Sequence, residues 1–297
     1  MVMQVKRKHF RHWGTFDYVN TLFMLIIMLV MLYPFWYVIM ASFSSMAHVQ
    51  THGVLLYPDG LRLAAYRQIF THNLIPGAYK NTIFITFAGT AISMVLTILG
   101  AYCRSVKTLP GRTVLTLYVV FTMWFGGGLV PTFLVVNSLG LVDSLWALIL
   151  PGAISAYNMI LMRNFFQNVP VDLYEAAEID GITRLGYMVR ILLPLSTASI
   201  ATISLFYAVG YWNSYFNSVI YIRSMDKWTM QMLLHQMLKG STELTNALYD
   251  NQAEINELAD ETMKCAMIVI TITPILIVYP FIQKYFVKGV MVGSLKG

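Results

Sequence analysis

The sequence predicts an all-α, polytopic membrane protein with six transmembrane helices. The first observation is composition: the chain of 297 residues is 57% hydrophobic and 11% charged, and its mean hydropathy of +0.62 is too high for an ordinary soluble domain. The second is run length, because several uncharged runs exceed the roughly 20 residues that cross a bilayer. The third is the uneven distribution of Lys and Arg between the loops that join these runs.

The uncharged runs place the spans at 18–43, 81–102, 114–137, 145–162, 194–222 and 265–283. Together they predict a single transmembrane domain that occupies residues 1–297. Gly and Pro inside the runs, such as Gly126 and Pro151, are tolerated in membrane helices that pack on neighbours. The first run is too long for a signal peptide and lacks a small-residue cleavage site, so we expect it to be retained as a span.

Basic residues predict the orientation. With six spans, thirteen of the twenty Lys and Arg residues fall on one side of the membrane, which should be cytoplasmic and hold both termini. These are Lys6, Arg7, Lys8, Arg11, Arg104, Lys107, Arg112, Arg163, Arg184, Arg190, Lys284, Lys288 and Lys296. The same arrangement gives a cytoplasmic loop at 163–193 and long external loops at 44–79 and 223–262. The net charge of +6 is then a topology signal, and no nucleic-acid partner is expected.

Several function classes are excluded by missing patterns. The chain has no G-x-x-x-x-G-K-[ST] loop to hold ATP, and no G-x-S-x-G or H-E-x-x-H hydrolase pattern. We therefore expect no catalytic residue and no enzyme activity. The predicted spans contain no internal Asp, Glu, Lys or Arg, which argues against a proton relay. Neither the two cysteines nor the loop histidines His48, His52 and His72 have metal-site spacing, so no metal site is predicted.

One polar stretch departs from this pattern. The segment "VPVDLYEAAEIDGITRLGYMVRILLP" (169–194, hereafter the polar segment) lies between the fourth and fifth predicted spans. Pro170 suits the first turn of a helix, Glu175 favours its positive end, and Gly181 suits its end. Thr183 can cap a second short helix that runs into the fifth span. The polar segment is thus a helix–Gly–helix unit that is either a spacer at the membrane surface or a docking element for a partner.

The spacing within the polar segment favours docking. The pattern Glu-Ala-Ala, three residues, Gly, nine residues, Ile, one residue, Leu-Pro resembles the motif of binding-protein-dependent ABC importer permeases. Residues 125–166 and the ending "QKYFVKGVMVGSLKG" (283–297) resemble the maltose-permease branch of that family, and most of all its complex-oligosaccharide subgroup. One departure is "LPLSTASI", where many relatives carry a proline soon after Leu-Pro.

This resemblance implies a type I ABC importer permease fold in a bacterial plasma (inner) membrane. It implies a permease subunit of an ATP-driven, binding-protein-dependent importer of sugars, with oligosaccharides as the expected substrate. The implied partners are a second homologous permease, two cytoplasmic ATPase subunits that bind ATP and Mg²⁺, and an extracytoplasmic sugar-binding protein. No cofactor is expected in this chain itself.

The same resemblance assigns the coupling to the ATPase subunits to six residues of the polar segment. We expect Tyr174 to be an apolar anchor, the alanines to give clearance to a partner, and Gly181 to permit the turn. Asp180 is expected either to orient the segment internally or to contact the partner. The six are Tyr174, Glu175, Ala176, Ala177, Asp180 and Gly181.

A substrate path is predicted in the fifth span, whose outer half reads "YAVGYWNSYFNSVIYI" (207–222). Aromatic rings stack on sugars and asparagines bond their hydroxyls, so Tyr211, Trp212, Asn213 and Tyr215 are candidate pathway residues. The alternative is an aromatic belt at the outer membrane interface. The loop 223–262 also has two interpretations: it is either a docking site for the binding protein or a solvated helical hairpin.

Two further classes stay open on sequence grounds. A sodium-coupled carrier, with the ion held by backbone carbonyls, would transport without any ATPase subunit. A structural or assembly protein of the membrane would show no substrate-dependent ATP hydrolysis.

Overall fold

The computed structural model describes residues 14–51, 56–71, 74–106, 109–239 and 261–294, and the regular elements in these ranges are all helical. The predicted all-α class is confirmed. Residues 240–260 of the predicted external loop, and Lys107, lie outside the described residues.

The first half of the chain contains α1 (Thr15–Ser42), α2 (Met46–Thr51), α3 (Ala64–Thr71), α4 (Leu74–Ser105), α5 (Arg112–Trp124), α6 (Leu129–Ser138), α7 (Trp146–Ile149) and η1 (Leu150–Gly152). The second half contains α8 (Ala156–Gln167), α9 (Asp172–Ile179), α10 (Arg184–Tyr187), η2 (Met188–Leu192), α11 (Leu193–Leu195), α12 (Thr197–Trp212), α13 (Tyr215–Tyr221), η3 (Met225–Lys227), α14 (Met230–Lys239) and α17 (Glu261–Ser294).

Three helices among the described residues are long and apolar enough to cross a membrane: α1, α4 and the 261–280 part of α17. Two bent pairs raise the total to as many as five. The pair α5 and α6 is bent by 112°, and Arg184–Leu195 with α12 by 83°. The first bend lies at the three glycines Gly126 to Gly128. Glycine favours a helix poorly, and Gly128 has φ +82°, outside the helical region.

The region predicted as the fourth span, 145–162, is not one helix. It consists of α7, the short 3₁₀ turn η1 and the first part of α8, with a break at residues 153–155. Pro151 lies in η1, and its missing N–H and fixed φ interrupt the helical hydrogen-bond ladder here. The count of six spans and the cytoplasmic termini remain predictions.

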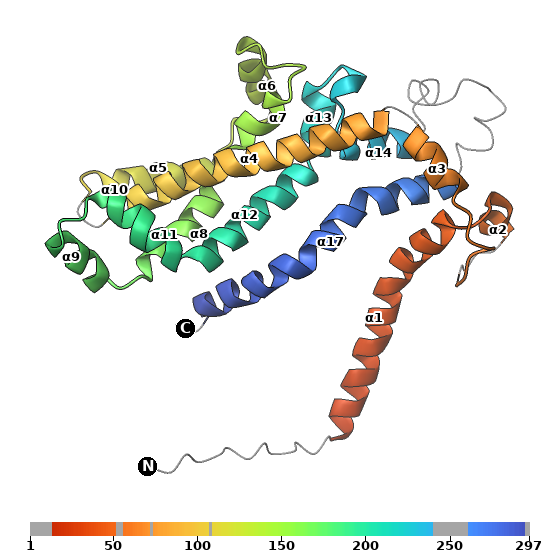
Figure 1. The fold of residues 1–297 in the computed structure, drawn as a ribbon, viewed down its shortest axis with the longest axis horizontal. Coiled ribbons are helices and arrows are strands. Elements are labelled where there is room, and N and C mark those ends of the chain that lie inside the picture. Colours follow the sequence, from red (N-terminus) through yellow and green to blue (C-terminus); the bar gives the residue numbers. More distant parts are fainter. Residues whose placement is uncertain (1–13, 52–55, 72–73, 107–108, 240–260, 295–297) are drawn as a thin grey trace.

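Helices α4, α12 and α17 form the body of the molecule (Figure 1). Helix α4 runs its full length, with α12 and α8 packed against it and α17 packed against α12. Helix α9 lies at one end of this body, whereas α13 and α14 lie toward the other, and α7 packs against α4 and α13 between the two ends. The apolar stretch of α1 is unburied within the chain, so in a membrane its side chains contact lipid or another subunit.

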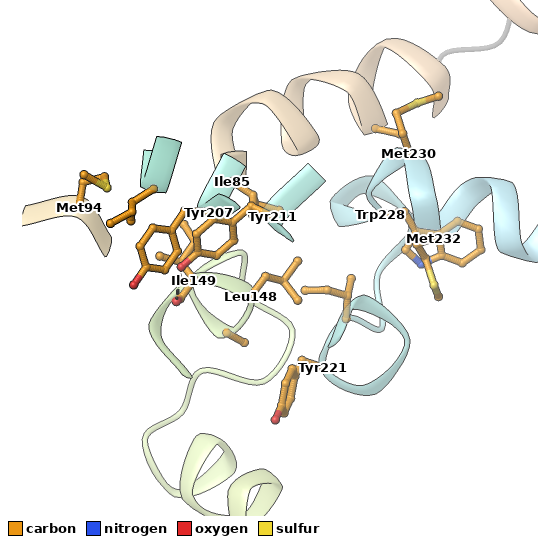
Figure 2. Packing of buried hydrophobic residues seen from close by; sticks show 14 of the residues in the cluster. Ile85, Met94, Leu148, Ile149, Tyr207, Tyr211, Tyr221, Trp228, Met230 and Met232 are labelled. Carbon is orange, nitrogen blue, oxygen red and sulfur yellow. Dashed lines mark hydrogen bonds between the residues drawn. The ribbon is translucent and has the colours of Figure 1, made fainter. Parts of the chain in front are cut away.

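The contact between α4 and α12 depends on small residues. A Cβ at Gly89 would lie 2.8 Å from the ring of Tyr211, so only glycine lets the ring pack flat on α4. Close helix approach over small residues is common in membrane proteins, where packing replaces the hydrophobic effect. Figure 2 shows Tyr211 and Tyr207 among Ile85, Leu148 and Ile149 in this buried cluster.

Candidate coupling and transport sites

The polar segment folds as two short helices separated by Gly181. Helix α9 has Asp172 and Glu175 in its first turn, where acidic side chains complement the helix dipole. At its end, Gly181 has φ +73°. The N–H of Ile182 bonds the carbonyl of Ala177 at 2.9 Å, and Gly181 bonds Glu178 at 3.1 Å. These two bonds form a Schellman motif, which confirms that Gly181 ends this helix, whereas its part in coupling stays a prediction.

The second helix begins at the predicted cap. The Thr183 Oγ1 accepts a 3.1 Å hydrogen bond from the backbone N–H of Gly186, which satisfies a free donor of the first turn. Helical structure then continues through α10, the π-helical turn η2 and α11 as far as Leu195. The expectation that this helix runs straight into the fifth span is wrong, because the chain turns by 83° between Leu195 and Thr197.

The predicted coupling residues divide between an outer and an inner face of α9. Glu175, Ala176, Asp180 and Gly181 are exposed. Ala177, by contrast, is 3% exposed and packs into the main core. Ala176 is therefore the alanine that an approaching partner meets, and the small size of Ala177 serves packing within this chain.

Sequence reasoning missed one residue of the outer face. Ile179 is 86% exposed and lies three or four residues from Ala176 and Glu175, on the same side of the helix. An isoleucine this exposed at the end of the molecule offers apolar area to a partner. Its spacing of three residues from Ala176 could have predicted that the two side chains share one face of the helix.

Tyr174 connects α9 to the rest of the chain. Its ring is half-buried and meets the ring of Tyr187 edge-on, with 5.1 Å between centroids. Behind the pair, the hydroxyl of Tyr102 at the end of α4 donates to the carbonyl of Arg184 at 2.8 Å. A cavity of 350 Å³ remains between α9 and the body, lined by these tyrosines and by residues including Phe166 and Val169; Glu175, although exposed, lines it as well. Tyr174 thus anchors α9 within its own subunit.

Two of the four candidate pathway residues are packing residues in this structure. The hydroxyl of Tyr211 is 2.9 Å from Ser93 Oγ and donates to the carbonyl of Ile149 at 3.2 Å. The indole of Trp212 donates to the carbonyl of Thr271 at 3.3 Å. Both side chains are 8% exposed. Through these bonds, Tyr211 holds α12 against α4 and α7, and Trp212 holds α12 against α17.

The other two candidates lie at the exposed end of the body, beside α14. Asn213 is exposed, and its Oδ1 accepts from Gln231 Nε2 at 3.2 Å. Tyr215 is 43% exposed, with its ring centroid 5.0 Å from that of His235. The structure therefore does not bring the four candidates to one surface.

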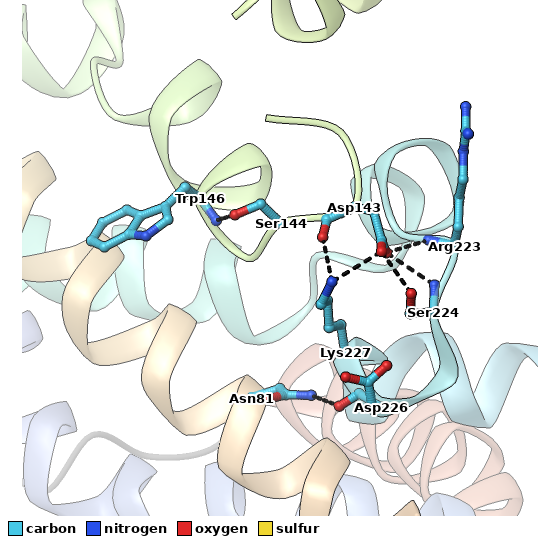
Figure 3. Close-up of polar contacts among 8 residues, drawn as sticks. All are labelled: Asn81, Asp143, Ser144, Trp146, Arg223, Ser224, Asp226 and Lys227. Carbon is cyan, nitrogen blue, oxygen red and sulfur yellow. Dashed lines mark hydrogen bonds and ion pairs between the residues drawn. The ribbon is translucent and has the colours of Figure 1, made fainter. Parts of the chain in front are cut away.

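A polar cluster at the same end was not predicted. The carboxylate of Asp143, in the connection between α6 and α7, accepts from the N–H of Arg223 at 3.0 Å and of Ser224 at 2.9 Å. Its other oxygen accepts from Ser224 Oγ at 2.6 Å and Lys227 Nζ at 2.9 Å. We call Asp143, Arg223, Ser224 and Lys227 the Asp143 cluster (Figure 3).

The Asp143 cluster fixes two connections that are eighty residues apart in the sequence. Hydrogen bonds from Ser224, then from Lys227 and Arg223, hold the pKa of the Asp143 carboxyl far below its usual value. Asp143 also has φ +61°, a backbone region that Asp tolerates better than most residues. Nothing in the local sequence pairs residue 143 with 223–227, because the contact exists only in the folded chain.

Among the described residues, no three His, Cys, Asp or Glu side chains gather to hold a metal ion. The fold is an apolar helical body with the exposed helix α9 toward one end and the Asp143 cluster toward the other. Together with helices long and apolar enough to cross a bilayer, this arrangement is typical of a membrane-embedded component with polar elements at its two ends.

Residues 97–292 match the model of the family described as "binding-protein-dependent transport system inner membrane component", and the chain belongs to that family. It is a bacterial ABC transporter permease subunit, a membrane component that does not itself catalyse ATP hydrolysis.

Two curated relatives come from Bacillus subtilis (strain 168). The polygalacturonan/rhamnogalacturonan transport system permease protein YtcP is 46% identical, over 95% of this chain and 98% of the relative. Protein LplC is 42% identical, over 95% of both chains. Among solved structures, a chain of a bacterial ABC transporter involved in the import of the acidic polysaccharide alginate superposes with a TM-score of 0.84. It is 35% identical, over 91% of this chain and 96% of that one.

Proposed function

We propose that this chain forms half of the translocation path of an ATP-driven importer for oligosaccharides that carry uronic acids. The observation that carries the coupling half of the proposal is the exposed outer face of α9, formed by Glu175, Ala176, Ile179 and Asp180 at one end of the body. Substrate class is supported by the relatives: one is named for polygalacturonan and rhamnogalacturonan transport and another for the acidic polysaccharide alginate. Polygalacturonan and alginate are both polymers of uronic acids.

The proposed assembly contains a second homologous permease, two cytoplasmic ATPase subunits and an extracytoplasmic sugar-binding protein. Six spans with both termini inside place the polar segment in the cytoplasm and the Asp143 cluster outside. Membership of a family named for binding-protein-dependent transport supports this set of partners. The ATPase subunits supply the bound ATP and Mg²⁺.

Coupling follows two routes away from α9 in this proposal. The first passes through α10, η2 and α11 to the bend before α12. The second passes through the Tyr174–Tyr187 ring contact and the Tyr102–Arg184 hydrogen bond to α4. A partner that moves α9 therefore displaces α4 and α12 together, because these two helices have the most extensive interhelical contact among the described residues. Rigid-body motion of packed helices of this kind is a common basis of alternating access.

Substrate-stimulated ATP hydrolysis tests the proposal. The permease pair with its ATPase subunits is reconstituted in vesicles and mixed with the binding protein. We expect oligogalacturonate-loaded binding protein to stimulate hydrolysis and uptake, and neutral glucose oligomers to fail. Stimulation by the neutral oligomers alone would reject the uronate assignment. Uptake that follows a sodium gradient and continues without ATP would reject the importer class in favour of a sodium-coupled carrier.

A further inference from the structure

A buried arginine lies at the end of α4. Arg104 is 3% exposed, and its Nε, Nη1 and Nη2 atoms are all buried without a hydrogen bond to any of the described residues. The sequence-based spans ended at residue 102, whereas α4 continues to Ser105 and carries this charge into the packed body. A guanidinium buried without a counter-charge is strongly unfavourable, so an anion nearby is expected.

A second arginine reinforces the charge. Arg163 of α8 lies against Arg104, and its Nε donates to the Arg104 carbonyl at 3.3 Å. The ion pairs within the described part of the chain are Arg62 with Asp59 and Lys227 with Asp143. Within that part, Arg104 and Arg163 therefore have no acidic partner.

A cavity of 690 Å³ opens beside Arg163, between the start of α5 and α8, and Arg104 does not line it. Its lining includes Arg163, Arg112 and Thr116. The Oγ1 of Thr116 is buried and has no hydrogen-bond partner within the described part of the chain, so its hydroxyl has a proton to donate to a ligand oxygen. The N-cap of α5 is Gly111, which has no side chain to cap the first-turn N–H groups. Cations, a hydroxyl and a helix N-terminus thus line one cavity, and all of them favour an anion.

The apolar surroundings favour an amphiphilic anion. Leu117 lines the cavity and is 63% exposed, and Val114 and Tyr118 on the same helix are 69% and 67% exposed. Helix α5 buries none of its residues. In a membrane, acyl chains would cover these side chains while a headgroup fills the cavity.

We propose that this cavity binds the phosphate of an anionic phospholipid headgroup. Guanidinium groups bind phosphate oxygens with two parallel hydrogen bonds, which suits Arg112 and Arg163, and basic pockets between membrane helices are known to take anionic headgroups. Arg104 lies behind Arg163 and adds positive potential to the site. The site is separate from α9 and from the substrate class, so it stands or falls independently of the proposed function.

Native mass spectrometry of the full chain, purified with its permease partner, tests the site. We expect phosphatidylglycerol to stay bound at collision energies that remove phosphatidylcholine. Arg163→Gln and Arg112→Gln should each weaken phosphatidylglycerol binding roughly fivefold or more. Arg190→Gln is the matched control, because it removes one exposed positive charge from the polar segment without touching the cavity, and it should leave the affinity unchanged.

Four outcomes would overturn the proposal. Equal retention of phosphatidylglycerol and phosphatidylcholine would show that the charge is not recognised. Equal effects of Arg163→Gln and Arg190→Gln would show non-specific attraction. Binding of inorganic phosphate as tight as that of the lipid would assign the cavity to the free anion. Retention of phosphatidylglycerol by the chain purified alone, but not by the permease pair, would show that the partner permease covers the cavity.

Discussion

The hydroxyl of Tyr102 donates a 2.8 Å hydrogen bond to the backbone carbonyl of Arg184, and so joins the end of α4 to the second helix of the polar segment. Tyr102 is 8% exposed and precedes the buried Arg104 by two residues. This bond is a direct connection between the proposed docking element and the long helix that packs on α12.

Tyr102→Phe tests that connection, because it removes the hydroxyl and keeps the ring. The loss of one neutral hydrogen bond should cost about 1 kcal/mol of stability, too little to unfold the chain. We expect fewer substrate molecules imported per ATP hydrolysed. Tyr157→Phe, at an exposed tyrosine of α8, is the control. If the transport-to-hydrolysis ratio is the same in both variants, the Tyr102 bond is only structural.

The packing of α4 on α12 gives a second prediction, with two glycines of one helix as test and control. Gly89→Ala places a Cβ 2.8 Å from the Tyr211 ring, whereas Gly77→Ala meets nothing within 4 Å. The first should destabilise the chain by about 1–3 kcal/mol through overpacking. The second should be neutral or stabilise it by up to about 1 kcal/mol through helix propensity. Thermal unfolding in detergent measures both, and equal midpoints would contradict the close contact.

Asp143→Asn should destabilise the connections that the Asp143 cluster joins. The substitution removes the charge that accepts from Lys227 and two backbone N–H groups, at a cost of about 1–3 kcal/mol. Asp226→Asn is the control, because Asp226 is exposed in the same connection and its backbone carbonyl, not its carboxylate, accepts from Asn81. A midpoint for Asp143→Asn no lower than that of the control would contradict the role of the cluster.

The difference in stability between the wild type and Asp143→Asn should depend on pH, because the pKa of Asp143 is lowered in the folded chain. A folded-state pKa below the unfolded value adds stability that is present above the unfolded pKa, near 3.9, and is lost as the pH falls through the folded pKa. The stability of the wild-type chain should therefore exceed that of the Asp143→Asn variant by a constant margin from pH 8 to about pH 5. The margin should shrink below about pH 4. Thermal midpoints across this range measure it, and a margin that grows on acidification would contradict the assignment.

Orientation is tested by labelling single cysteines. In a background without Cys103 and Cys265, of which Cys103 is exposed, cysteines are placed at the exposed positions Glu175 and Asp226. An impermeant maleimide added outside should label position 226 in intact cells. It should label position 175 only after permeabilisation. The reverse pattern would invert the proposed topology.

Features that depend on local chemistry were predictable from the sequence. Gly181 ends α9 in a left-handed conformation and Thr183 caps the next helix, because these roles depend on residues a few positions apart. The helical class followed from composition. In each case the determining interactions lie within one or two turns of the chain.

Features that depend on tertiary packing were not predictable. The 83° bend before α12 and the inward position of Ala177 both reflect how helices pack. A tyrosine such as Tyr211 has the same sequence pattern whether its hydroxyl meets a sugar or Ser93. The Asp143 cluster joins residues eighty positions apart, and the sequence contains no periodic signal for such a contact.

The central claim is that the outer face of α9 docks into a partner that drives transport. Ala176→Arg tests it most directly, because Ala176 is exposed and the arginine can extend into solvent without disturbing the fold. Buried unpaired between two subunits, the same arginine would cost several kcal/mol. Asn164→Arg, at an exposed position of α8, controls for added charge.

The decisive measurement is co-purification of the ATPase subunits together with oligosaccharide uptake, in the wild type and both variants. We expect the Ala176→Arg variant to assemble with its permease partner at wild-type levels, to lose most of the bound ATPase and to lose uptake. The Asn164→Arg variant should keep both the bound ATPase and uptake. Wild-type ATPase binding and uptake in Ala176→Arg would contradict the account and leave the polar segment as a spacer between two helices.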